Sequence, residues 1–458
     1  MEYRIEHDSM GEMQVPAWAL WGAQTERSRR NFPIGVGQET MPVEIIRAFA
    51  QVKKAAALTN RALLPEKMTA EKCEAICEAA DAILSGDLAA HFPLVVWQTG
   101  SGTQTNMNVN EVIANRGNAQ TGKSLLHPND DVNRSQSSND TFPTALHVAA
   151  ALAVKNRVLP AVDGLIAELR RLEAENEDAL KIGRTHLQDA TPLRFSQEIS
   201  GWRASLEQDR RMLELTLPPL MELALGGTAV GTGLNAPAGF DALVAKTLSD
   251  LTGTAFTSAP NKFHALTSLD ELVFAHGAMK ALAADLLKIA NDVRLLASGP
   301  RCGLGEITIP ANEPGSSIMP GKVNPTQCEQ VTMVAVQVLG NDAAIGVAAS
   351  QGQFELNTFL PVCAYNFLQS ARLLAESVTA FTARCVRGIC ANRERMAQNM
   401  ERSLMLATAL SPHVGYEKAA RVAQLAAERG SSLREACAAL GYLTAEQFDA
   451  FVRPEQMV

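Results

Sequence analysis

Residues 269–297 read LDELVFAHGAMKALAADLLKIANDVRLLA, and this stretch decides the fold. It has many alanines and few polar residues for its length. A pattern of this kind predicts a helix that is apolar on more than one face and is therefore buried by neighbours on several sides. The stretch 325–349 has the same character. We therefore expect a bundle of long helices that continues across subunits.

Helical spacing dominates elsewhere too. In AVDGLIAELRRLEAENEDAL (161–180), apolar residues recur at steps of three and four: Val162, Leu165, Ile166, Leu169 and Leu172. Strand patterns are short and confined to the N-terminal region, as in GEMQVPA (11–17). The fold class expected is mostly α, in three parts: an N-terminal domain 1–134, a central helical bundle 135–394 and a small C-terminal helical domain 395–458.

Composition excludes several classes of protein. The 458 residues are 47% hydrophobic and 20% charged, as is typical of a folded globular chain. A net charge of −8 without a basic cluster argues against nucleic acid as a partner. The N-terminus is charged from its second residue and no long uncharged apolar run appears, so we expect no signal peptide, no membrane span and a cytoplasmic location. The eight scattered cysteines fit reduced thiols better than disulfides or a metal site.

Four polar segments interrupt the helices: QTGSGTQTNMNVNE (98–111), HPNDDVNRSQSSND (127–140), GRTHLQDATP (183–192) and GSSIMPGKVNP (315–325). They supply short hydrogen-bonding side chains, namely Ser101, Thr103, Ser137, Ser138, Asn139, Thr185 and Asn324. With backbone N–H groups at glycines and helix N-termini, such residues can hold carboxylates without a metal. Caps and turns explain any single segment. Four segments in one helical chain favour a binding site.

Two ionisable residues in these segments suit acid–base chemistry and anion binding. A histidine side chain in general titrates near neutral pH, so His186 suits acid–base work, although a lone His is more often structural. Lys322 follows Gly321 and lies near Ser316, so it is either a solvated loop residue or the cation for an anionic substrate. Glu329 could pair with Lys322 or His186, or it could be an exposed acid in the first turn of a helix.

Together these segments resemble the fumarase/aspartase superfamily, and class II fumarases in particular. GSSIMPGKVNPTQCE (315–329) is similar to the signature loop of that superfamily, whose general form is GSSxMPxKxNP, and the resemblance covers the whole chain. GRTHLQDATP points to fumarases, because aspartases carry Gln where this chain has His186. An ammonia-lyase acting on aspartate is the alternative among enzymes. A catalytically inactive helical scaffold is the alternative outside them, but it would be expected to lose His186, Ser316 or Lys322.

The resemblance implies a specific assembly and reaction. The subunit is expected to be a three-domain, almost all-helical chain whose central helices form a homotetramer. The reaction implied is reversible addition of water to fumarate, giving (S)-malate through an aci-carboxylate, in the tricarboxylic acid cycle and without metal or other cofactor. Three chains are expected to contribute to each active site.

The resemblance also implies residue roles. Ser316 takes the C3 proton of malate, and His186 acts as acid and base at the hydroxyl through a water, with Glu329 behind it. The substrate-binding residues implied are Ser101, Gly102, Thr103, Ser137, Ser138 and Asn139 from one chain, Thr185 from another, and Ser317, Lys322, Val323 and Asn324 from a third.

A second dicarboxylate site is implied at His127, Pro128, Asn129 and Asp130. Relatives often place a basic residue within three positions before this His. Here those places hold Ser124, Leu125 and Leu126, and Lys123 is one step further away.

Overall fold

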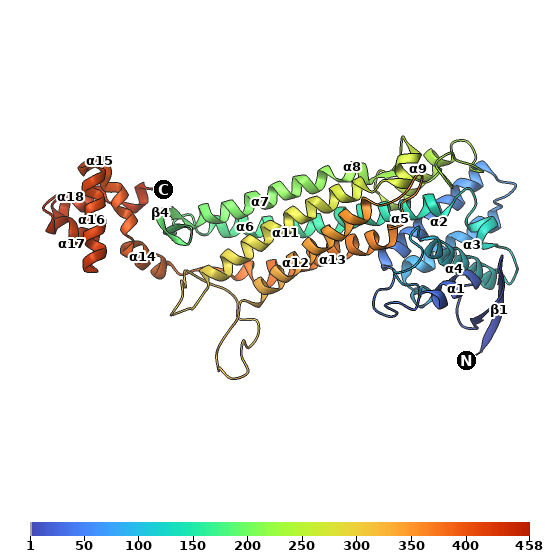
Figure 1. The fold of residues 1–458 in the computed structure, drawn as a ribbon, viewed down its shortest axis with the longest axis horizontal. Coiled ribbons are helices and arrows are strands. Elements are labelled where there is room, and N and C mark those ends of the chain that lie inside the picture. The colour runs from blue at the N-terminus through green and yellow to red at the C-terminus, as the bar shows by residue number, and fades with distance from the viewer. Residues whose placement is uncertain (1) are drawn as a thin grey trace. The chain divides into compact units, whose positions relative to one another are not determined.

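A computed structural model describes residues 2–458 (Figure 1). The residues group into two compact units. The first unit comprises Met1–Pro160, Arg211–Ala283 and Val336–Ala375, and the second comprises Ala161–Arg210, Ala284–Ala335 and Glu376–Val458. The predicted three-domain division at 134/135 and 394/395 stays a prediction.

The first unit begins with an antiparallel hairpin of β1 (Tyr3–Asp8) and β2 (Gly11–Pro16), in which Tyr3 lies opposite Pro16. The strand predicted at GEMQVPA is thereby confirmed. Four helices follow: α1 (Ala23–Asn31), α2 (Val43–Leu63), α3 (Ala70–Ser85) and α4 (Thr103–Thr121). They pack through apolar faces such as that of α2, where Ile45, Phe49 and Val52 are fully buried.

Long helices form the main part of the chain, and the mostly α fold class is confirmed. α5 (Ser138–Ala153) continues through a π-helical turn (Val154–Val158) into α6 (Leu159–Ala174). The others are α7 (Phe195–Leu215), α11 (Asp270–Leu296), α12 (Thr326–Ala349) and α13 (Leu360–Arg384). The helices predicted at 269–297 and 325–349 are therefore present as α11 and α12.

A buried polar cluster connects three of these helices. His276 of α11 is fully buried, and its Nδ1 lies 3.0 Å from Oδ1 of Asp342 on α12. Its Nε2 lies 2.9 Å from Oγ of Ser370 on α13. Asn341 donates a further bond to the same Ser370 hydroxyl, at 3.0 Å. Because apolar helices can slide past one another at little cost, these directional bonds fix their relative positions.

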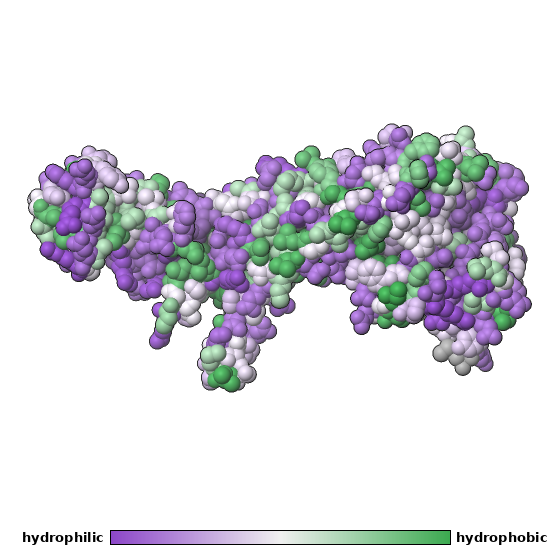
Figure 2. All heavy atoms as spheres, viewed as in Figure 1, coloured by the Kyte–Doolittle hydropathy of each residue, from purple (hydrophilic) through white to green (hydrophobic). Residues whose placement is uncertain are grey.

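α12 has two apolar faces. One face is buried within the chain and includes Val331, Ala335, Val338, Ile345 and Ala348. The other face is exposed and repeats at alternating steps of three and four residues: Met333, Val336, Gly340, Ala343 and Val347. Met333 and Val347 are each 66% exposed. Hydrophobic residues are also exposed along the central long helices in Figure 2. This spacing is that of a helix–helix seam.

Strands are not confined to the N-terminal region, so that expectation was wrong. An antiparallel hairpin forms from β3 (Leu180–Thr185) and β4 (Gln188–Arg194). The apolar–polar alternation of β3 ends after Ile182, because Gly183, Arg184 and Thr185 follow, and the polar Lys181 is itself buried and pairs with Glu198. The pattern used to recognise strands was therefore incomplete. Shorter strands pair as β5 (Glu222–Leu223) with β6 (Thr257–Ser258), and β7 (Ile307–Thr308) with β8 (Cys390–Ala391).

The remaining helices are short. Three lie in the first unit: α8 (Leu217–Leu220), α9 (Phe240–Thr252) and α10 (Lys262–Thr267). The C-terminal segment of the second unit contains α14 (Arg393–Arg402), α15 (Ser411–Val414), α16 (Tyr416–Arg429), α17 (Leu433–Ala439) and α18 (Ala445–Phe451). This segment has its own apolar cluster, which includes Leu410, Val422, Cys437 and Phe448.

Two helices are long and apolar enough, by length and composition, to cross a membrane: Ser138–Ala174 and Thr326–Ala349. In the first, 72% of the apolar window is buried within the protein, as in a core helix. The second is only 33% buried, but Gln337 and Asn341 both donate hydrogen bonds to Gln369 of α13. Such polar contacts favour packing against protein. The expectation of no membrane span stays a prediction.

The His276 cluster predicts how stability depends on pH. Burial lowers the pKa of His276, although the neighbouring Asp342 opposes this, so the folded protein binds a proton at this ring less readily than the unfolded chain does. Stability from the neutral ring is complete above the unfolded pKa of about 6.5 and is lost as the pH falls below it. We expect the urea midpoint of unfolding to fall between pH 7.5 and 5.5, and to fall less in His276→Asn. The exposed His7→Asn is the control. An equal pH dependence in His276→Asn and the unmodified chain would contradict the prediction.

Candidate active site

His186 lies at the tip of the β3–β4 hairpin. Thr185 pairs with Gln188, so His186 and Leu187 alone form the turn. Their φ angles are 59° and 62°, as in the type I′ turn that matches strand twist. Non-glycine residues adopt positive φ at a cost, and such conformations gather at functional sites. Thr185, His186 and Leu187 are all exposed, so the tip presents its side chains to solvent.

A buried charge cluster lies at the base of the same hairpin. Arg184 donates two hydrogen bonds to Glu306, at 3.0 and 2.6 Å. Lys181 donates to Glu198 at 2.8 Å, and its Nζ is 3.4 Å from Glu306. Asn399 donates to Glu306 as well, at 2.9 Å. Sequence reasoning missed all these residues, because the partners are far apart along the chain.

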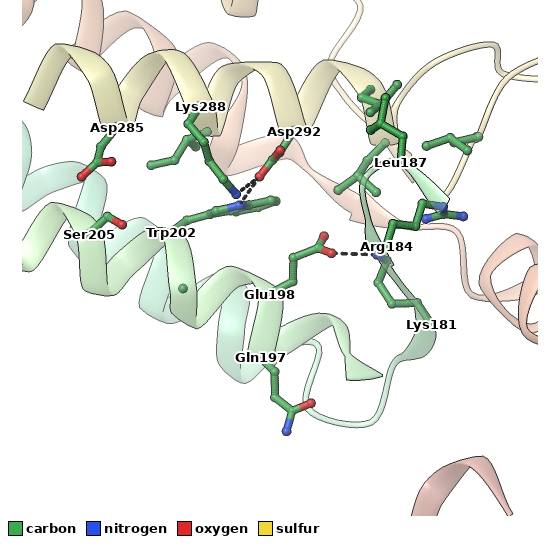
Figure 3. Close-up of a pocket in the computed structure, with 15 residues that line it drawn as sticks. Lys181, Arg184, Leu187, Gln197, Glu198, Trp202, Ser205, Asp285, Lys288 and Asp292 are labelled. Carbon is green, nitrogen blue, oxygen red and sulfur yellow. Dashed lines mark hydrogen bonds and ion pairs between the residues drawn. The ribbon is translucent and has the colours of Figure 1, made fainter. Parts of the chain in front are cut away.

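This cluster borders a cavity of about 450 Å³ between the hairpin, α7 and α11 (Figure 3). Trp202 lies along the cavity and donates its indole N–H to Asp292, which also pairs with Lys288. The cations that line the cavity are thus paired with carboxylates. The cavity therefore offers no free positive charge to a dicarboxylate.

The two N-terminal polar segments meet through Asn106 of α4. Its amide donates to Oγ of Ser138 at 2.9 Å, and Ser101 and Thr103 share a hydrogen bond of 2.9 Å just before it in the chain. Gly102 begins α4 at φ 71°, and a Cβ there would lie 2.0 Å from the ring of Phe142. Only glycine fits this position. The structure thus brings the Ser101–Thr103 and Ser137–Asn139 segments together. That they bind substrate stays a prediction.

Ser137–Asn139 forms the N-terminus of α5. Ser137 and Asp140 form a reciprocal capping box, in which the Ser137 N–H donates to Asp140 at 2.8 Å. Burial raises the pKa of Asp140 to about 6, against the lowering effect of its backbone hydrogen bonds. Burial also lowers the pKa of Lys53 to about 7, and its ammonium donates to Asn133 and Gln136. Neither Asp140 nor Lys53 was identified from the sequence, because each looked like an ordinary helix residue.

The loop at 315–325 is closed by its own hydrogen bonds. The Gly315 N–H donates to the Lys322 carbonyl at 2.7 Å, and Asn324 donates to the Gly315 carbonyl at 2.8 Å. Lys322 donates to Asn324 at 2.7 Å, and its exposed ammonium forms no ion pair with any residue of 2–458. Ser317 and Val323 are exposed. Glu329 lies half-buried in the first turn of α12, and its catalytic role stays a prediction.

Ser316 accepts hydrogen bonds from two backbone N–H groups of this loop. The Ile318 N–H lies 3.2 Å from its Oγ, and the Met319 N–H lies 3.0 Å away. Two donors aimed at one oxygen stabilise negative charge there. The sequence alone could not reveal this arrangement.

The predicted catalytic residues do not meet within one chain. Across residues 2–458, no hydrogen bond or ion pair joins His186 to Ser316, Lys322 or Glu329. Thr185 and His186 are grouped on the hairpin, and the residues of the 315–325 loop are grouped separately. Their assignment to one site therefore stays a prediction.

The HPND segment borders a different cavity, of about 510 Å³. His127 caps a π-helical turn, and its Nδ1 accepts the N–H groups of Asn129 and Asp130. The residues that line this cavity, all within the described chain, include Glu6, Asp8 and Glu111 but neither Lys nor Arg. Glu6 is paired with Arg4 and Asp8 with Arg27, so the lining offers no free positive charge to a dianion. The second dicarboxylate site stays a prediction, and this lining makes it a weak one.

One cluster in the described part of the chain has enough donors for a metal ion: His264, Asp270 and Glu271. The two imidazole nitrogens face different carboxylates, Nε2 towards Asp270 at 3.1 Å and Nδ1 towards Glu271 at 3.8 Å. Each of the three side chains offers one ligand atom, and these atoms lie within 4.8 Å of one another. The expectation of a metal-free reaction stays a prediction.

The chain is thus built of long helices interrupted by polar segments. The family described as "Lyase" matches residues 11–340, and "Fumarase C C-terminus" matches residues 406–458. The class II fumarate hydratase of Bacillus cereus is 62% identical over all of this chain and 99% of its own length. That of Helicobacter pylori is 58% identical with the same coverage.

Solved structures agree with these sequence relatives. The class II fumarase from Schistosoma mansoni superposes with a TM-score of 0.97 at 43% identity, over 100% of this chain and 99% of that one. The fumarate lyase:delta crystallin from Brucella melitensis, described as bound to cobalt, gives 0.94 at 42% identity with the same coverage. The chain belongs to the class II fumarate hydratase family.

The acidic lining of the HPND cavity generates a prediction. We expect His127→Asn to leave kcat and KM for malate within about twofold of their original values, because the site adds little to binding. Isothermal titration with malate should give the same number of sites per subunit before and after the change. A loss of one site per subunit in His127→Asn would show that the second site binds strongly after all.

Proposed function

We propose that the chain catalyses the reversible hydration of fumarate to (S)-malate in the cytoplasm, as a step of the tricarboxylic acid cycle. The observation that carries the mechanism is the pair of backbone N–H groups on Ser316. A free serine is a poor base, and its alkoxide needs fixed donors. The loop supplies them without a metal or another cofactor.

In the direction from malate, Ser316 Oγ takes the proton from C3. The C–H electron pair moves into the adjacent carboxylate and forms the doubly charged aci-carboxylate. Lys322 and Asn324 stabilise that charge where it develops, and Lys322 suits this role because its ammonium has no other counter-ion among residues 2–458. Ser317 and Val323 complete the binding loop.

The second half of the reaction expels the hydroxyl group. His186 gives a proton through a water, the C2–O bond breaks, and water and fumarate result. Thr185 holds the substrate beside this ring, and Glu329 supports the proton transfer. The segments Ser101–Thr103 and Ser137–Asn139 hold the second carboxylate through hydroxyl, amide and helix N-terminal N–H groups.

We propose a homotetramer in which three chains contribute to each site. The exposed seam of α12 supports this assembly, because the Met333, Val336, Gly340, Ala343 and Val347 repeat is what one helix presents to another. The lack of any bond within one chain between His186 and the Ser316 loop also fits sites completed by other copies.

An ammonia-lyase reaction on aspartate is the rival within the superfamily. His186 favours a hydroxyl leaving group, which needs a proton at neutral pH. Fumarate absorbance with malate or with aspartate as substrate separates the two reactions. We expect activity with malate and none with aspartate. We also expect the activity with malate to persist in the presence of a chelator. Activity that disappears on chelation and returns with added metal would overturn the metal-free mechanism.

Two substitutions test the residue roles. His186→Asn keeps a polar side chain but removes the proton carrier, so kcat should fall by about 10²–10⁴-fold. Ser316→Ala should lower kcat with little change in KM, because it acts on the transition state rather than on substrate binding. Near-normal kcat in either variant would show that the role is misassigned. His413→Asn, an exposed change in the C-terminal segment, is the control.

Mixed tetramers test the sharing of sites. His186→Asn and Lys322→Met chains are each expected to be inactive alone. If His186 and Lys322 of one site come from different chains, unfolding both variants together and refolding them should leave roughly a quarter of sites intact. Activity should return to about that fraction. No recovery, with mixed tetramers confirmed by native mass spectrometry, would place both residues on the same chain.

A further inference from the structure

Within one chain, the turn at His186 and Leu187 does not itself fix the orientation of the hairpin. Positive φ at both His186 and Leu187 is disfavoured for these residue types, and Leu187 is 73% exposed, so packing within the chain does not compensate at the turn. The strands are also irregular, because their register shifts between Ile182 and Arg184. The orientation of the tip must therefore be fixed at its base.

The base is a buried and electrically balanced cluster. Glu306 is fully buried, and the Lys181 side chain is 1% exposed. Lys181 and Arg184 supply two positive charges, and Glu198 and Glu306 supply two negative ones. Burial raises the pKa of Glu306, but the hydrogen bonds from Arg184 and the charge of Lys181 outweigh this effect and hold the pKa below its usual value. Removing one charge would leave another buried without a partner, which is costly.

The main chain of Glu306 is fixed as firmly as its side chain. Its N–H donates to the Leu296 carbonyl at the end of α11, at 2.9 Å, and its carbonyl accepts the Asn392 N–H at 2.8 Å. The next residues form β7, which pairs with β8. Glu306 is thus an immobile point against which the guanidinium of Arg184 is clamped by two parallel hydrogen bonds.

We infer that Glu306 is a positioning residue for His186, acting through Arg184, which lies two residues before it on β3. The inference rests on the proposed function, in which His186 moves the proton at the hydroxyl. A small displacement of an acid–base group is enough to slow catalysis strongly, since misplacement by about 1 Å costs on the order of 10²-fold. Glu306 itself touches neither substrate nor reacting atoms in this role.

The test is Glu306→Gln, which keeps the shape of the side chain but removes its charge. We expect kcat to fall by about 10–100-fold, and KM for malate to change by less than about threefold. Arg184→Lys keeps the charge but loses the two-bond clamp, so it should give an intermediate loss. Glu173→Gln is the matched control, because it breaks a carboxylate–arginine pair with Arg203, a pair in the same unit that includes no residue of the hairpin. It should keep the original kcat.

Two readouts separate positioning from general loss of structure. In D₂O, exchange of the malate C3 proton, followed by NMR, reports the Ser316 step alone. The ratio of exchange to fumarate formation should rise in Glu306→Gln, whereas misfolding lowers both rates equally. In the double variant His186→Asn/Glu306→Gln, kcat should match His186→Asn within about twofold, because two changes that act through one group are not additive.

Each outcome either supports or overturns the positioning role of Glu306. An unchanged exchange ratio, or a double variant much slower than His186→Asn, would overturn it. If Glu306→Gln yields no folded protein by circular dichroism, Arg184→Lys carries the same two measurements. A His186→Asn variant with normal kcat would overturn the proposed role of His186 instead. A slow His186→Asn beside a normal Glu306→Gln would remove only the positioning role.

Discussion

α12 is apolar on two opposite faces, and this sets the terms for how the long helices can pack. One face is covered within the chain, but the seam of Met333, Val336, Gly340, Ala343 and Val347 has no cover there. A helix that is apolar on two sides is stable only when neighbours enclose it. The bundle therefore supplies length and rigidity, and the polar chemistry is left to the segments that interrupt it.

Those segments are ordered by local hydrogen bonds before any substrate binds. Ser137 and Asp140 cap α5, Gly102 admits the ring of Phe142, and Lys322 and Asn324 close their loop. Groups held in this way need little reorganisation when charge develops on a bound dicarboxylate. The same principle extends to His186. Ion pairs at the base of its hairpin, rather than packing at the tip, hold that hairpin in place. Binding geometry thus comes from many short contacts within each segment.

The sequence predicted the features that depend on local pattern. α11 and α12 followed from long apolar runs, and the polar segments stood out against them. The β3–β4 hairpin could not be predicted from the sequence, because its inward-facing Lys181 and Arg184 look like surface residues until their partners are known. Glu306 lies 122 residues from Arg184, so no spacing rule connects the two. The roles of His186, Ser316 and Lys322 came from family resemblance, and the N–H groups on Ser316 required coordinates.

The two-residue turn at His186 also limits how this chain can diverge. Surface loops generally tolerate insertions and deletions, since closing a longer loop costs little. This turn is different, because it sets Thr185 opposite Gln188 and so fixes the register of the strand ends next to it, before the shift between Ile182 and Arg184. Successive side chains of a strand point to opposite faces, so one inserted residue would send those of β4 to the wrong side. Among relatives that keep this hairpin, the tip can change in residue type but not in length.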